Sequence, residues 1–181
     1  MKKIFLLLAA ACVTLSAAAD EGMWMLPYLQ KMNSKDMKAR GCKLSAEEIY
    51  SMNNSSLKDA IVIFGGGCTG EIGSPDGLLF TNHHCGYGSI QSLSSVEHDY
   101  LKNGFWAMSR AEELPNEKLW VRFLVRMEEV TDRIAAGETA AQIVEKAKAE
   151  GTGYKASVEQ MYYGNQQFLF IYEQFDDVRL V

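Results

Sequence analysis

The clearest pattern of hydrophobic and polar positions lies between residues 60 and 87, and it predicts strands. Ala60–Phe64 is a short apolar run followed by three glycines, which is typical of a buried strand. Cys68–Ile72 is a second extended piece, and Leu78–Thr81 is an apolar strand that returns along it. Between them, Ser74–Gly77 has the sequence Ser-Pro-Asp-Gly. Proline fixes φ and glycine supplies conformational freedom, so these four residues predict a tight turn.

Three stretches have the periodicity or the capping residues of helices. Gly22–Arg40 carries methionine and aromatic side chains four residues apart and stops before Gly41, so we expect a helix with that stripe in the core. Ser45–Tyr50 has capping-box spacing and predicts one helical turn. Thr139–Glu150 begins with a second capping box and carries an apolar stripe. We expect this last helix to be a surface insertion.

The remaining elements are shorter. Leu119–Val125 alternates apolar and polar residues and predicts a strand with one apolar face. After the first hairpin, short helices or turns are predicted over Ser89–Val96 and Glu97–Phe105. We expect the aromatic group Gly104–Trp106 in the core, and we expect a polar loop over Glu112–Asn116. Two extended segments are predicted near the end of the sequence, Tyr162–Glu173 and Asp177–Val181.

The first nineteen residues predict an export signal. Met1–Ala19 has two lysines, an apolar run too short to span a bilayer, and an Ala-x-Ala site. A retained membrane anchor is the alternative. The chain carries 18 basic and 23 acidic residues, a net charge of −5. Cleavage after Ala19 would leave 16 basic residues against the same 23, a net charge of −7. No basic patch remains, so nucleic acid is an unexpected partner.

Four cysteines and three histidines supply the candidate chemistry. Export implies an oxidising compartment, in which Cys68 and Cys85, at similar heights on the predicted hairpin, suit a disulfide. Cys42 would remain a free or buried thiol. A metal site is the alternative, because His83, His84 and Cys85 are adjacent. Neighbouring histidines point in different directions, however, and no further Cys or His motif completes a tetrahedral set.

The stretch SLKDAIVIFGGGCTGEIGSPDGLLFTNHHCGYGSIQ is similar to the histidine segment of the S46 serine peptidases, and EHDYLKNGFWAM, ELPN, DVRLV and the segment DEGMW extend the resemblance. The resemblance implies a mainly β fold with added helices, the N-terminal part of a chymotrypsin-like double β-barrel, over residues 20–181. It also implies that His84 is the general base, that Cys68 and Cys85 form a disulfide, and that His83 has no catalytic role. Release of dipeptides from the N-termini of oligopeptides, without a cofactor, is the implied activity.

Two members of a catalytic triad are not found in the sequence. No Gly-x-Ser-Gly turn occurs, and the family pattern puts the triad aspartate and serine beyond Val181. We therefore expect the first part of a longer exported enzyme of the periplasm or cell surface of a Gram-negative bacterium, inactive by itself. After signal cleavage we expect no membrane association, and the resemblance allows a homodimer of the full-length protein. The alternative is a non-catalytic exported envelope protein on a protease-like fold.

Overall fold

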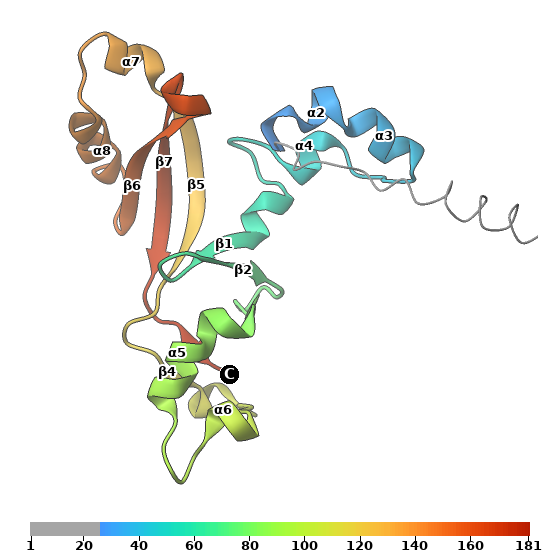
Figure 1. The fold of residues 1–181 in the computed structure, drawn as a ribbon, viewed down its shortest axis with the longest axis vertical. Helices are drawn as coiled ribbons and strands as arrows, with labels where there is room; N and C mark the ends of the chain where they lie inside the picture. The colour runs from blue at the N-terminus through green and yellow to red at the C-terminus, as the bar shows by residue number, and fades with distance from the viewer. Residues whose placement is uncertain (1–25) are drawn as a thin grey trace, which may run out of the picture.

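The structure is a computed structural model that describes residues 26–181. An antiparallel sheet of six strands, in the order β3-β2-β1-β5-β7-β6, runs through it (Figure 1). A second sheet pairs the short strands β4 and β8 antiparallel. The strands are β1 (Ile61–Phe64), β2 (Cys68–Ile72), β3 (Leu79–Thr81), β4 (Leu114–Pro115), β5 (Val121–Glu129), β6 (Tyr154–Met161), β7 (Gln166–Phe175) and β8 (Arg179–Leu180).

Helices lie at both ends of this sheet (Figure 1). The described α-helices are α2 (Leu29–Met32), α3 (Ser34–Ala39), α4 (Ala46–Ile49), α5 (His83–Leu93), α6 (Tyr100–Asn103), α7 (Thr131–Ala135) and α8 (Ala140–Lys148). Short 3-10 turns are η1 (Leu26–Tyr28), η2 (Leu57–Ala60), η3 (Arg110–Glu112) and η4 (Tyr162–Gly164). The predicted mainly β fold with added helices is confirmed.

Strand β5 changes the face of its apolar side chains halfway along. Val121 and Phe123 pair with β7 residues on one face, and a register shift follows between Leu124 and Arg126. The extra residue of such a bulge moves all later side chains to the opposite face. Met127, only 5% exposed, therefore lies on the other face from Val121. The predicted strand is confirmed, but its single apolar face ends at the bulge.

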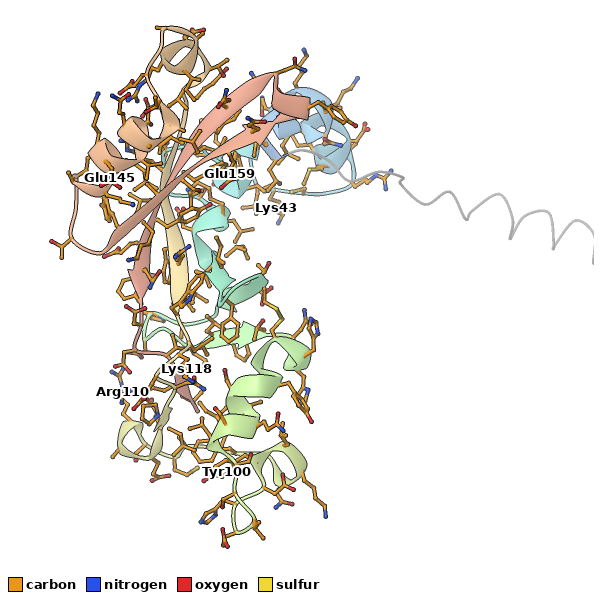
Figure 2. All side chains as sticks on the ribbon, turned by 60° about the vertical axis from the view of Figure 1, so that its left-hand side comes forward. Lys43, Tyr100, Arg110, Lys118, Glu145 and Glu159 are labelled. Atoms are coloured by element: carbon orange, nitrogen blue, oxygen red, sulfur yellow. A yellow bond between two sulfur atoms is a disulfide. The ribbon has the colours of Figure 1, made fainter. Side chains whose placement is uncertain are left out.

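One apolar core lies between helices α7 and α8 and strands β6 and β7. Ile143 and Ala147 of α8 are each 1% exposed and pack against Leu169 and Ile171 of β7. The predicted helix and its Thr139 capping box are confirmed. The expected surface insertion is wrong, because the apolar stripe of α8 covers one face of the sheet. Figure 2 shows its solvent side, where Glu145 is labelled.

A second core lies where β1, β2 and β5 meet. Val62, Phe64 and Val121 are buried there, and Cys68 and Cys85 pack against them. Strand β1 starts at Ile61 because Ala60 still belongs to the 3-10 turn η2. The predicted hairpin is confirmed: β2 pairs with both β1 and β3, and Gly77, at φ 84°, closes the turn onto Ser74.

The N-terminal helical segment is less buried than the sequence predicts. Helix breaks at Asn33 into α2 and α3, and Gly41, at φ 95°, follows its end. Tyr28 is 41% and Met32 54% exposed, so the expectation that this stripe packs in the core is wrong for these two residues. The start of the predicted stretch, residues 22–25, lies outside the described residues, as does the predicted signal Met1–Ala19.

Three further expectations need correction. Trp106, expected in the core, is 79% exposed. The predicted polar loop Glu112–Asn116 contains strand β4, which pairs with β8. Strand β6 was not predicted at all, although it forms an edge of the main sheet. Within the part of the chain that the structure describes, no helix has the length and apolar character needed to cross a membrane.

Candidate functional site

The candidate site lies where strand β3 passes into helix α5. Strand β3 ends at Thr81, Asn82 is extended at φ −70° and ψ 142°, and α5 begins at His83. The helix was not predicted to start here, because two glycines, Gly86 and Gly88, stand in its first two turns. Glycine is unfavourable in a helix by about 1 kcal/mol relative to alanine. As a result, both histidines lie in the first turn of a helix and not at the end of a strand.

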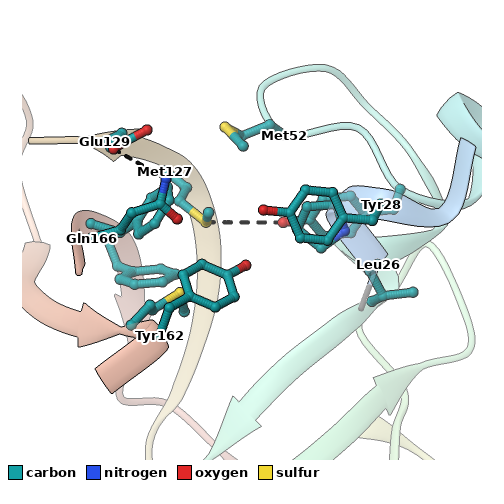
Figure 3. A pocket seen from close by; sticks show the side chains of 12 residues that line it. Leu26, Tyr28, Met52, Met127, Glu129, Tyr162 and Gln166 are labelled. Atoms are coloured by element: carbon teal, nitrogen blue, oxygen red, sulfur yellow. Dashed lines mark hydrogen bonds between the residues drawn. The ribbon is translucent and has the colours of Figure 1, made fainter. Parts of the chain in front are cut away.

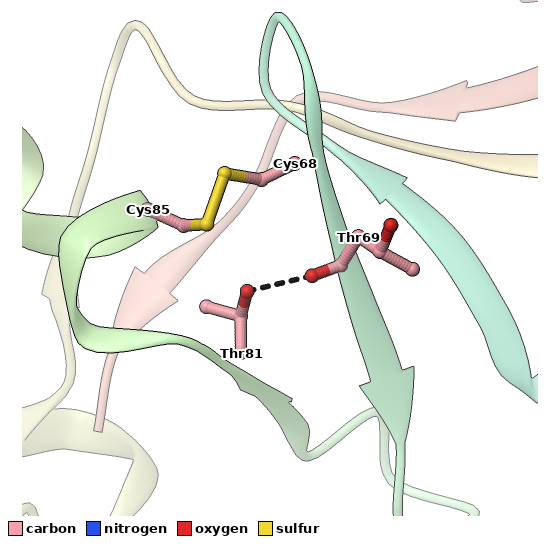
Figure 4. The surroundings of a disulfide bond; sticks show 4 residues. All are labelled: Cys68, Thr69, Thr81 and Cys85. Atoms are coloured by element: carbon pink, nitrogen blue, oxygen red, sulfur yellow. Dashed lines mark hydrogen bonds between the residues drawn. A yellow bond between two sulfur atoms is a disulfide. The ribbon is translucent and has the colours of Figure 1, made fainter.

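The predicted disulfide between Cys68 and Cys85 is present (Figure 4). It joins the first residue of β2 to the first turn of α5, and the two Cα atoms lie 6.0 Å apart, which is an ordinary separation for a disulfide. Its sulfur atoms lie beside the second core. Cys42 is free of any disulfide and half-buried, as expected. The first turn of α5 is therefore covalently fixed to the sheet.

The two neighbouring histidines have different surroundings. The His83 ring lies edge-on to the ring of Tyr87, one turn further along α5, with 5.7 Å between the centroids. A ring nitrogen of His84 lies within 4.8 Å of the sulfur atoms of both Cys68 and Cys85. His84 is exposed, so its imidazole is open to a reacting group. The structure thus separates the two residues by their contacts: His83 packs on its own helix, and His84 lies beside the disulfide.

The disulfide also bears on the alternative of a metal centre. The ligand atoms of Cys68, His84 and Cys85 are close enough together to hold an ion. Both sulfurs are bonded to each other, however, and a metal-ligating cysteine is a thiolate. The donor set that remains is one imidazole, so the described residues do not fit a zinc site.

Asp76 and Asp177 are each paired with an arginine and not with His84. Asp76, in the turn between β2 and β3, accepts a hydrogen bond from the Arg110 guanidinium at 2.8 Å. The carboxylate of Asp177 accepts two hydrogen bonds from Arg179, each at 2.8 Å, and these lower the pKa of Asp177. Residues 26–181 provide no carboxylate that is hydrogen-bonded to the His84 ring. The site holds a candidate base without an orienting acid.

Exposed apolar side chains occur around the same end of the molecule. Trp106 is 79%, Met108 80% and Val96 96% exposed, and Phe80 on the edge strand β3 is 58% exposed. Figure 2 shows this end, where Tyr100, Arg110 and Lys118 are labelled. No pattern in the sequence indicates this exposure, since large apolar side chains are usually buried.

A cavity of about 520 Å³ lies away from the His84 site, between the N-terminal segment and the face of β5 and β7 that α8 does not cover (Figure 3). This cavity was not predicted from the sequence. Its walls are mainly methionine and aromatic side chains, and the Tyr50 hydroxyl lies 3.9 Å from the Met127 sulfur. Burial raises the pKa of Tyr50, and the neighbouring Tyr28 hydroxyl raises the pKa of Tyr162. Because no described residue of the His84 site lines it, this cavity is not part of that site.

The comparison with protein families identifies the chain. A family model described as Peptidase S46 matches residues 19–181. The chain belongs to the peptidase S46 family. It is 49% identical over 177 residues to "Dipeptidyl-peptidase 7" of Capnocytophaga gingivalis, an alignment that covers 90% of this chain and 25% of that protein. It is 45% identical to "Asp/Glu-specific dipeptidyl-peptidase" of the same organism, over 100% of this chain and 27% of that protein.

A solved structure of the family has the same fold. Porphyromonas endodontalis DPP11 in complex with the dipeptide Arg-Glu matches with a TM-score of 0.80 and 41% identity, covering 90% of this chain and 27% of the DPP11 chain. The S46 chain described above therefore spans about a quarter of the length of the relatives it matches. This match agrees with the expected N-terminal part of a chymotrypsin-like double β-barrel.

Proposed function

We propose that the complete protein is a serine-type dipeptidyl-peptidase that removes dipeptides from the N-termini of oligopeptides, with His84 as its general base. The observation that supports this most is the position of His84, exposed in the first turn of α5 and beside the Cys68–Cys85 disulfide. A general base has to stay within hydrogen-bond reach of the proton it takes, so a cross-linked support suits that task. Membership of a peptidase family supplies the reaction class.

The chemistry expected of His84 follows from a serine triad. Its imidazole takes the proton from the serine hydroxyl as that oxygen attacks the scissile carbonyl, and then gives it to the leaving amine. An aspartate holds the other ring nitrogen. Both partners are expected in the three quarters of the relatives' length that this chain does not span. We therefore propose that residues 20–181 alone have no peptidase activity and form the first part of the catalytic domain.

The remaining parts of the proposal concern substrate and location. Relatives named dipeptidyl-peptidase 7 and Asp/Glu-specific dipeptidyl-peptidase are 49% and 45% identical, so the proposed substrates are oligopeptides without a stated preference for the cleavage-adjacent residue. The predicted signal Met1–Ala19 supports export to the periplasm or cell surface. A homodimer of the full-length protein remains an expectation from the family resemblance.

Two matched variants test the role of His84. In the full-length protein, His84→Ala should reduce kcat by several orders of magnitude, because a triad without its base loses most of its catalysis. His83→Ala should cost far less, since it removes only the ring contact with Tyr87. The measurement is kcat and KM on dipeptidyl fluorogenic substrates, with circular dichroism to show that both variants are folded.

The outcomes separate the proposal from its alternatives. Near-normal turnover of His84→Ala together with an inactive His83→Ala would show that the wrong histidine has been assigned. A folded full-length protein without any turnover on a panel of oligopeptides would favour the non-catalytic envelope protein. Turnover by purified residues 20–181 that disappears in His84→Ala would contradict the proposed inactivity of this chain alone.

A further inference from the structure

Two separate links join consecutive residues of β2 to the segment that carries His84 (Figure 4). The Cys68–Cys85 disulfide is the first. In the second, the Thr81 hydroxyl donates a hydrogen bond to the main-chain carbonyl oxygen of Thr69, with 2.7 Å between the oxygen atoms. Thr81 lies three residues before His84 and Cys85 lies one residue after it. The segment of the candidate base is therefore attached to β2 on both sides.

The side-chain hydrogen bond of Thr81 reaches one residue of β2 beyond the last regular strand pair. The ladder between β2 and β3 has three residue pairs, and its last pair joins Gly70 to Thr81. The side-chain bond to Thr69 extends the attachment by one residue along β2, toward Cys68. The next residue, Asn82, is the N-cap of α5 and makes no side-chain capping bond. Thr81 thus provides a link at the start of α5 that the helix cap does not provide.

We propose that Thr81 is a positioning residue for His84, acting through its hydroxyl on the junction between β3 and α5. This inference rests on the proposed role of His84 as general base. A displacement of the base by about 1 Å can cost on the order of a hundredfold in rate, whereas binding of substrate depends on other contacts. Weakening the junction should therefore lower kcat and leave KM nearly unchanged.

Three substitutions in the full-length protein isolate the hydroxyl. Thr81→Val keeps the branched shape and removes the donor, and Thr81→Ser keeps the donor. Thr69→Val is the matched control, because Thr69 accepts through its main-chain oxygen and its own side chain is exposed. Since a hydrogen bond has a net effect of about two- to tenfold on an equilibrium, kcat of Thr81→Val should fall by about that factor. Thr81→Ser and Thr69→Val should stay close to the wild type.

The two links should also be coupled. If both hold the same segment, Thr81→Val should cost more in a Cys68→Ala, Cys85→Ala background than in the disulfide-bonded protein, because the remaining link no longer supports the junction. Should the double alanine variant fail to fold, the comparison of Thr81→Val with Thr81→Ser in the disulfide-bonded protein still decides. Equal loss of kcat in those two, or no loss in Thr81→Val, would overturn the proposal.

A readout that is independent of activity separates this inference from the proposed function. The amide of Cys85 donates to the Asn82 carbonyl at 2.9 Å, so its hydrogen exchange reports whether the first turn of α5 opens. Thr81→Val should accelerate that exchange, and Thr81→Ser should not. Faster exchange with unchanged kcat would refute the link to catalysis. Normal turnover of His84→Ala would instead refute the proposed function. The exchange result would then still show whether the Thr81 hydroxyl stabilises the junction between β3 and α5.

Discussion

Removal of the Cys68–Cys85 cross-link should destabilise the chain by an amount that its position predicts. The two cysteines are 17 residues apart in sequence. In the chain-entropy account, closing a loop of that length lowers the conformational entropy of the unfolded state. This raises the free energy of unfolding by about 3 kcal/mol at 25 °C. For a chain of this size each kcal/mol corresponds to about 2–4 °C, so the expected fall in Tm is about 6–12 °C.

The choice of variant keeps the packing of the second core. Cys68 and Cys85 pack against Val62, Phe64 and Val121, so a serine would place a hydroxyl against apolar side chains. The double variant Cys68→Ala, Cys85→Ala avoids this. It should be made in a Cys42→Ser background, because Cys42 is the free cysteine of the described residues and would otherwise form mixed disulfides.

The assay is thermal and urea unfolding of residues 20–181, with and without a reductant. The Cys42→Ser protein should lose its extra stability on reduction and then resemble the double alanine variant, which the reductant should not affect. Non-reducing peptide mapping should recover the peptides of Cys68 and Cys85 linked. Coincident unfolding midpoints in the oxidised and alanine forms would refute the entropy argument, and two free thiols in exported protein would refute the cross-link itself.

Two further predictions concern helix α8 and the loop between α7 and α8. Arg133 and Lys146 hold the pKa of Glu138 at about 2, below its usual 4.5, so the stability contributed by Glu138 should be complete above pH 4.5 and disappear as the pH falls toward 2. Unfolding curves of Glu138→Gln at different pH values should lack this part of the pH dependence, and Glu145→Gln is the control. The same dependence of stability on pH in Glu138→Gln and in the wild type would contradict the prediction. Ile143→Ala should cost about 2–5 kcal/mol in urea unfolding, because its side chain is buried between α8 and β7. A cost below about 0.5 kcal/mol would be typical of a surface position and would refute the packing described for α8.

The sequence predicts the elements whose signals are local. Capping boxes at Ser45 and Thr139, and the turn closed by Gly77, are confirmed because each depends on residues within four positions of one another. The disulfide falls in the same group, since one hairpin brings Cys68 and Cys85 together.

Elements that depend on distant partners were missed. Strand β6 has the sequence YKASVEQM, in which few residues are strongly apolar, and it forms because it pairs with β7 along its whole length. The bulge in β5 is likewise decided by its pairing with β7. Packing of α8 against Ile171 depends on residues more than twenty positions away, so periodicity predicts the helix but not the surface that it covers.

The candidate site was predictable as a segment but not in its geometry. His83 and His84 are chemically identical imidazoles, so residue type cannot distinguish them. The structure distinguishes them through contacts, since the ring of one lies against Tyr87 and the ring of the other lies near the disulfide. A helix beginning at His83 was hidden by its glycines, although that helix decides where both side chains point.

The support of His84 lies mainly in β2 and not in the helix that carries it. Three consecutive residues of β2 attach to the segment around the histidine: Cys68 through the disulfide, Thr69 through its carbonyl oxygen, and Gly70 through strand pairing. Gly70 itself is buried, and a Cβ atom there would lie 2.9 Å from a methyl group of Leu79, so the packing of the Leu79 side chain over β2 depends on glycine. Since β2 pairs with β1, and β1 with β5, this support continues into the main sheet. The described part of this S46 peptidase can therefore hold His84 in place through contacts that all lie within residues 26–181.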